Sequence, residues 1–83
     1  MIPRNIVLRL RNTAVRDLVG ALESDGFTYR RTGGSGRVYR HGDGRRVVVH
    51  YHHGGDTLPL GTLLSVLTGT LWTENDLRRL GLL

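Results

Sequence analysis

Residues 37–51 read RVYRHGDGRRVVVHY and decide the fold. Residues 37–41 and 45–51 are rich in β-branched and aromatic side chains, which favour strands. Between them, Gly42-Asp43-Gly44 contains an Asp-Gly pair, a strong local signal for a tight hairpin turn. The stretch therefore predicts two antiparallel strands joined by that turn.

The flanking segments predict one more strand and three helices. Residues 13–23 carry apolar side chains at three- and four-residue spacing, typical of an amphipathic helix that Thr13 would cap and Gly26 would end. Residues 27–31 alternate as a strand does, and a glycine-rich loop follows over residues 32–36. Helices are expected over residues 60–68 and 73–80. Residues 1–12 fit either an edge strand or a helical turn.

This order predicts an α+β fold, a two-layer sandwich of the α-β-β-β-α kind found in double-stranded-RNA-binding domains, with a short extra C-terminal helix. A chain of 83 residues allows one small domain, assigned to residues 13–83 after an N-terminal extension, residues 1–12. Trp72 is expected to fill the core. The other expected core residues are Val15, Leu18, Leu22, Phe27, Val38, Val47 or Val48, Leu63, Val66 and Leu67.

Composition excludes several classes of protein. The chain has no cysteine, which rules out disulfides, thiolate zinc sites and a cysteine nucleophile. No apolar run approaches the roughly 18 residues of a membrane span. The N-terminus also shows no secretory signal, so a cytoplasmic protein without membrane contact is expected.

The positive charge is concentrated in one region. All 12 basic residues are Arg, against seven acidic residues, which gives a net charge of +5. Six of these arginines fall between Arg30 and Arg46, where Asp43 is the single acid. A local excess of this kind favours an anionic partner, with nucleic acid first. A hairpin that uses Arg for solubility alone is the alternative.

Two further features could carry chemistry. The loop Gly33-Gly34-Ser35-Gly36 could cradle a phosphate, but it lacks the Gly-Lys-Ser/Thr continuation of a P-loop. The four histidines, His41, His50, His52 and His53, fit no metal-binding motif, so we predict no metal and no other cofactor. Contact with nucleic acid, or acid–base work in RNA cleavage, suits them better.

The motifs together resemble the HicA (YcfA-like) toxin family over residues 14–80. The resemblance implies a double-stranded-RNA-binding-like fold and a toxin of a type II toxin–antitoxin system. It also implies a ribosome-independent mRNA interferase, an endoribonuclease that inhibits translation, and a HicB-like antitoxin partner that blocks the active site. The matching pieces are Gly26-Phe27, Arg31, Gly34-Ser35, Val38-Tyr39-Arg40-His41, Asp43-Gly44-Arg45-Arg46-Val47, His52 and Gly61-Thr62-Leu63.

One departure from the family pattern concerns catalysis. The family reads Gly-Ser-His with a catalytic histidine, whereas this chain reads Gly34-Ser35-Gly36. Glycine cannot move a proton, a contribution worth about 10²–10⁴ in rate, so the chain is expected to be inactive or very weak. His41 or His52 could serve instead. His50 stands where the family often has proline.

The predicted site therefore centres on Gly36, the position of the family histidine, and Ser35. With Val38 inward, strand alternation would expose Arg37, Tyr39 and His41. The alternatives to a nuclease are a non-catalytic double-stranded-RNA-binding-like module and a protein-interaction subunit that docks an acidic partner. The residues expected to contact RNA are Arg31, Gly34, Arg37, Tyr39, Arg40, His41, Arg45, Arg46 and His52.

Overall fold

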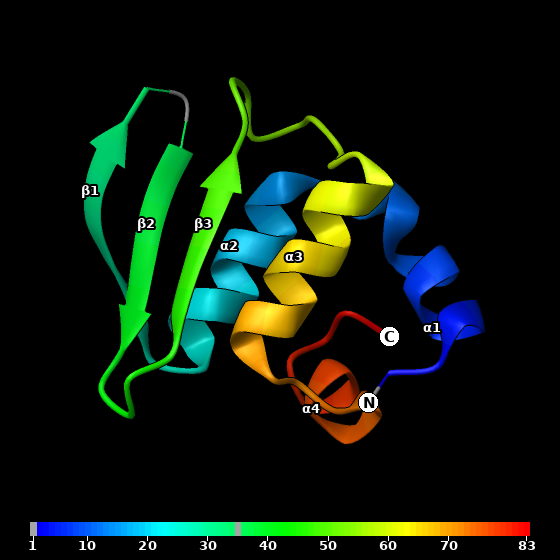
Figure 1. Cartoon of the computed structure of the whole chain (residues 1–83). Coiled ribbons are helices and arrows are strands. Elements are labelled where there is room, and N and C mark those ends of the chain that lie inside the picture. The colour runs from blue at the N-terminus through cyan, green and yellow to red at the C-terminus, as the bar shows by residue number, and fades with distance from the viewer. Residues whose placement is uncertain (1, 35) are drawn as a thin grey trace.

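The computed structural model describes residues 2–34 and 36–83 and confirms the α+β prediction. Three antiparallel strands form a sheet in the order β1-β2-β3, and helices α2 and α3 lie against one of its faces (Figure 1). The strands are β1 (Phe27–Gly33), β2 (Gly36–His41) and β3 (Arg46–His50). The helices are α1 (Arg4–Arg9), α2 (Val15–Ser24), α3 (Leu60–Thr70) and α4 (Glu74–Arg79), with a 3-10 turn η1 (Leu10–Asn12) after α1.

The hydrophobic core fills the space between the sheet and the helices. Every residue predicted for the core is buried, with Val47 rather than the half-buried Val48 as the β3 contribution. Trp72 is buried in the same cluster, as predicted. Helix α3 packs closely on β3 at Gly69, where an added Cβ would lie only 2.8 Å from the carbonyl oxygen of Arg46. A larger residue there would push the two layers apart.

The N-terminal segment is helical, so the edge-strand alternative for residues 1–12 is wrong. Helix α1 and the turn η1 bury Ile6, Val7 and Leu10 in the same cluster as the sheet residues. None of the described helices has the length and apolar character needed to cross a membrane.

The ends of the elements follow local chemistry with one exception. Gly26 ends α2 with a φ of 98°, a backbone conformation that favours glycine, and Thr73 begins α4 through a capping box with Asp76, as predicted. The predicted cap at Thr13 is wrong, because α2 begins at Val15 after Ala14. Ala14, the residue before the helix, is instead extended and forms a β-bridge with Thr57.

The predicted orientation of β2 is wrong. Tyr39 is 4% exposed and belongs to the core, together with its β3 partner Val47. Val38 is buried as predicted, but it pairs with Val48 outside the core cluster, on the opposite face. Tyr39 therefore takes the inward position, where its larger ring buries more apolar area against the helices than Val38 would.

Candidate nucleic-acid interface

The sheet face turned away from the helices, here called the open face, presents three rows of cross-strand partners. Partners in an antiparallel sheet share a face, and alternate residues along a strand share it too. Successive rows are therefore about 7 Å apart along the strands. The rows are Gly33, Gly36 and His50; Arg31, Val38 and Val48; and Thr28, Arg40 and Arg46.

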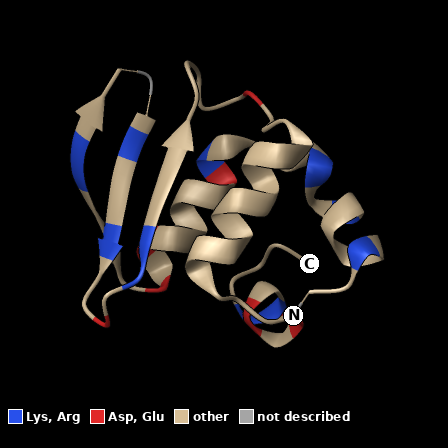
Figure 2. Ribbon diagram, in the orientation of Figure 1, with Lys and Arg blue, Asp and Glu red and all other residues tan. Residues whose placement is uncertain are grey.

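The open face is positively charged without neutralising acids. Arg31, Arg40 and Arg46 are all exposed, and among the described residues none of them forms an ion pair with a carboxylate. The strands carry no acidic residue, so red segments lie only in turns, loops and helices (Figure 2). Arg40 lies directly opposite Arg46, an arrangement that destabilises a sheet by repulsion between like charges. A bound anion would relieve that repulsion.

Gly36 and His50 make the closest contact in the first row. Gly36 is buried although it has no side chain, and His50 is exposed at the end of β3. A Cβ added at Gly36 would lie 2.8 Å from His50 Cε1 and 3.2 Å from His50 Nδ1. The imidazole therefore covers the backbone of Gly36. His50 is not among the residues predicted for the site, and its cross-strand register with Gly36 is the signal that could have identified it.

Two predicted RNA contacts lie on the helix side instead. The Arg37 guanidinium lies 4.1 Å from the ring centre of Tyr51 and donates a hydrogen bond to the Tyr51 carbonyl at 3.2 Å. Burial, followed by interactions with Tyr51, raises the pKa of Tyr39 to about 12. Tyr39 therefore remains a neutral phenol at neutral pH, and the expectation that it is exposed is wrong.

His41, expected on the exposed face, is a structural residue in this fold. Its Nε2 donates to the Asp25 carbonyl at 2.7 Å, and its Nδ1 accepts from the Asp43 N–H at 3.1 Å. Its ring packs edge-on against Phe27, with ring centres 5.1 Å apart. A Cβ at Gly26 would lie 2.9 Å from His41 Nε2, so this contact also depends on a glycine. Both ring nitrogens are used in joining the α2–β1 turn to the β2–β3 turn.

Arg45 is held in a network centred on Asp25. Its guanidinium lies 3.3 Å from Asp25 and 2.8 Å from Asp43, and it donates to the Thr70 carbonyl. Burial alone would raise the pKa of Asp25. Hydrogen bonds from Trp72 and Arg79 and the charges of Arg45 and Arg79 outweigh burial and hold that pKa below its usual value. The network ties the C-terminal ends of α2 and α3 to the hairpin, and it leaves Arg45 little freedom to reach a ligand.

The remaining predicted residues lie on loops. His52 is exposed just beyond β3, and Gly34 is exposed in the β1–β2 turn with a φ of 59°. Ser35 lies outside the described residues. The structure thus brings Arg31, Gly36, Arg40 and Arg46 together on one face, adds His50, and separates Arg37, Tyr39, His41 and Arg45 from them.

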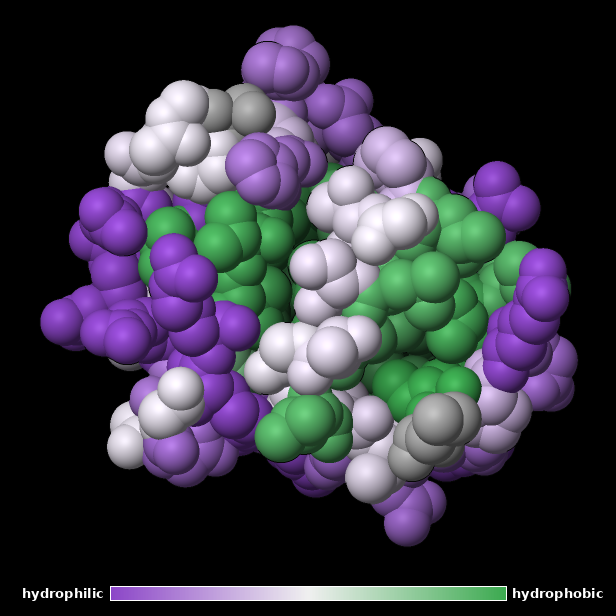
Figure 3. Space-filling model, in the orientation of Figure 1, coloured by the Kyte–Doolittle hydropathy of each residue, from purple (hydrophilic) through white to green (hydrophobic). Residues whose placement is uncertain are grey.

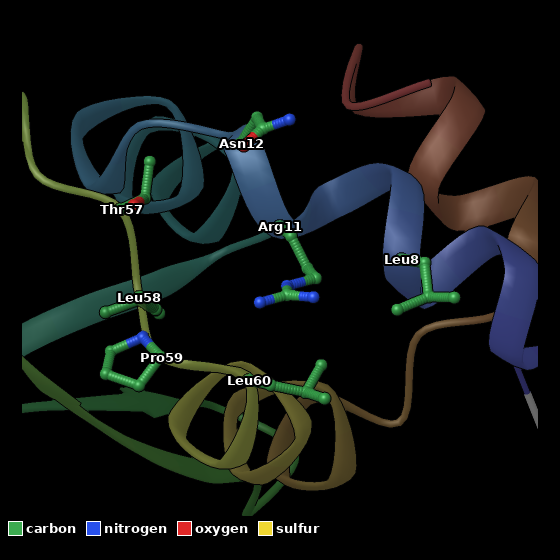
Figure 4. A pocket seen from close by; sticks show the side chains of 7 residues that line it. All are labelled: Leu8, Arg11, Asn12, Thr57, Leu58, Pro59 and Leu60. Atoms are coloured by element: carbon green, nitrogen blue, oxygen red, sulfur yellow. The ribbon is translucent and has the colours of Figure 1, made fainter.

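Outside the open face, the surface carries a depression near η1 and an apolar area. The one shown in Figure 4 lies between η1 and the start of α3, with Arg11 as its charged lining residue. Apolar side chains gather over α1 and α3 (Figure 3), where Leu8 and Leu64 are exposed. In the described ranges, no three His, Cys, Asp or Glu side chains are grouped so that they could hold a metal ion.

Comparison with known proteins identifies the family of the chain. A family model described as the HicA toxin of bacterial toxin–antitoxin systems matches residues 15–72, from the start of α2 to Trp72. None of the curated proteins matches the sequence. The matched segment covers the sheet, both core helices and the open face, and the chain therefore belongs to the HicA toxin family.

Proposed function

We propose that this toxin of the HicA family is an endoribonuclease of the mRNA interferase type that binds mRNA on the open face of its sheet. The observation that carries the proposal is the set of Arg31, Arg40 and Arg46, which are exposed together and form no ion pair with any carboxylate in residues 2–34 and 36–83. Arg guanidinium groups meet phosphate through two parallel hydrogen bonds. Action on mRNA places the protein in the cytoplasm.

We expect glycine at residue 36 to slow RNA cleavage. Residue 36 is the proposed position of the catalytic imidazole and is glycine in this chain, so cleavage is expected to be much slower than with a histidine at that position. A HicB-like antitoxin would silence the toxin by covering the open face. Its acidic side chains would compete with RNA phosphates for the same arginines.

The test is cleavage of a structured mRNA in EDTA by the chain and by a variant with the histidine at residue 36. Because a side chain at residue 36 meets the His50 ring at 2.8 Å, the useful variant is Gly36→His combined with His50→Ala. The double variant should cut RNA much faster than the chain itself. Abolition of that cutting by a chelator would contradict metal-independent chemistry.

Two other outcomes would replace the proposal. If both proteins bind RNA tightly and neither cuts it, the chain is a non-catalytic RNA-binding module. If neither binds RNA at moderate salt, the arginines serve an acidic protein partner instead.

A further inference from the structure

His50 takes the space that a side chain at residue 36 would occupy. The two residues are direct cross-strand partners on the open face, and a Cβ at residue 36 would meet His50 Cε1 at 2.8 Å. Real Cβ atoms essentially never approach a neighbour that closely, so a side chain at residue 36 would force the His50 ring to shift from its present position. The present position of the ring over β2 therefore depends on glycine at residue 36.

We propose that His50 is the catalytic imidazole of this toxin, supplied by β3 where Gly36 of β2 provides none. The inference rests on the RNA-cleaving function proposed above. Among the described residues, His50 is the one histidine on the open face. His41 lies on the other face and uses both ring nitrogens, and His52 and His53 lie beyond the end of β3.

The surroundings of His50 suit a phosphodiester. Gly33 and Gly36 complete its row, so the two neighbouring strands present backbone without side chains beside the ring. Glycine is used where a ligand must approach the backbone closely. Arg31 stands on the next row, about 7 Å along the sheet and, with β2 between the two strands, about 10 Å across it. A phosphate held by the long Arg31 side chain would lie on the same face as the imidazole, so an RNA strand could contact both.

The reaction needs one base and water. The His50 imidazole takes the proton of a ribose 2′-hydroxyl, and the 2′-oxygen forms a bond to phosphorus while the bond from phosphorus to the 5′-oxygen breaks. The departing 5′-oxygen takes a proton from water, and the imidazolium returns its proton to the resulting hydroxide. The products are a 2′,3′-cyclic phosphate and a 5′-hydroxyl, without oxidant, reductant or metal.

The main experiment compares the full chain with His50→Ala, in EDTA, on an end-labelled structured mRNA. We expect slow cleavage by the chain and a loss of about 10²-fold or more in His50→Ala. Affinity for RNA should change less than about threefold, because the phosphate-binding arginines remain. His53→Ala is the matched control, since it removes an exposed histidine from the neighbouring loop, and it should cut as the chain does. Added imidazole should restore part of the His50→Ala activity.

A second variant tests the position of the ring without touching His50. Gly36→Ala should displace the imidazole, because the new Cβ meets Cε1 and Nδ1 of His50. The backbone tolerates alanine, since Gly36 is not among the residues with positive φ. We therefore expect folded Gly36→Ala protein that binds RNA normally and has lost most of its cleavage.

The outcomes separate the two proposals. If the Gly36→His/His50→Ala double variant cuts RNA but the chain itself does not, the nuclease function stands and the role of His50 is wrong. Equal cleavage by the chain and His50→Ala would overturn that role as well. If none of the proteins cuts RNA, the nuclease function itself fails.

Discussion

If RNA binds on the open face, the arginines there set how steeply its affinity falls with salt concentration. Replacing Arg31, Arg40 and Arg46 with Gln removes three charges from exposed positions that form no ion pair with described carboxylates. Gln keeps a long polar side chain, so the sheet should be preserved, and substitutions at such sites change stability by about 0.5 kcal/mol or less. Relief of the repulsion between Arg40 and Arg46 acts in the stabilising direction.

The magnitude follows from counterion release. Each phosphate neutralised on a single strand contributes about −0.7 to the slope of log affinity against log salt. Three lost contacts should make the slope shallower by about 2. Between 50 and 200 mM salt, the intact chain should therefore lose roughly 20-fold more affinity than the triple variant. Fluorescence anisotropy with a labelled single-stranded RNA measures both slopes.

The matched control removes the same number of charges elsewhere. Arg4, Arg9 and Arg11 are exposed on α1 and η1, on the far side of the helices from the sheet (Figure 2). Changing all three to Gln lowers the net charge equally, but should leave most of the slope intact. Equally reduced salt slopes in the two triple variants would show that RNA binding depends on net charge alone. The assignment of binding to the open face would then be refuted.

Three predictions concern the scaffold. Asp25→Asn should lower the free energy of unfolding at pH 7 by about 1–3 kcal/mol, since it weakens hydrogen bonds and ion pairs that hold the Asp25 pKa down. A lowered carboxyl pKa stabilises the fold at pH values above the ordinary pKa of 3.8. The difference in unfolding free energy between the chain and Asp25→Asn should therefore shrink as the pH falls into the acid range, which chemical denaturation at several pH values measures. Gly26→Ala should cost roughly 1–3 kcal/mol in chemical denaturation, because of its φ of 98° and its contact with His41; an unchanged midpoint would contradict this. Leu71→Gly should raise stability by up to about 1 kcal/mol, since Leu71 is 71% exposed with a φ of 56°, whereas Leu71→Ala should give no such gain.

The sequence predicted the three strands and three of the helices, but not the helical N-terminal segment or which face of β2 joins the core. The hairpin, the stop at Gly26 and the cap at Thr73 were predicted because turns and caps depend on a few adjacent residues. The inward side of β2 was not, because Val38 and Tyr39 are both apolar enough to be buried and both are. Which of them joins the core depends on how the sheet meets two helices, and no local pattern reports that. The extra residue at the Tyr29–Arg31 bulge also shifts Arg31 onto the open face.

The positions of the predicted site residues depend on the same tertiary packing. Arg37 and Arg45 look equivalent to Arg40 and Arg46 in the sequence, and only tertiary partners distinguish them. Arg37 stacks on Tyr51, and Arg45 completes the charge network of Asp25. Both contacts join residues at least 14 positions apart, beyond the reach of motif spacing. The charge count therefore does not distinguish the arginines of the open face from those held on the helix side, whereas the strand register does.

The proposed role of His50 depends on its pairing with Gly36 across two neighbouring strands. A proton is moved by an imidazole nitrogen at a particular place, and the identity of the strand that carries it has no chemical consequence. In an antiparallel sheet, directly opposed residues have Cβ atoms about 4.5–5.5 Å apart, within the reach of one imidazole side chain. A histidine on β3 can therefore cover the same backbone as a histidine on β2, provided that its partner is glycine. The glycine that removes one imidazole is also the residue that makes room for the other.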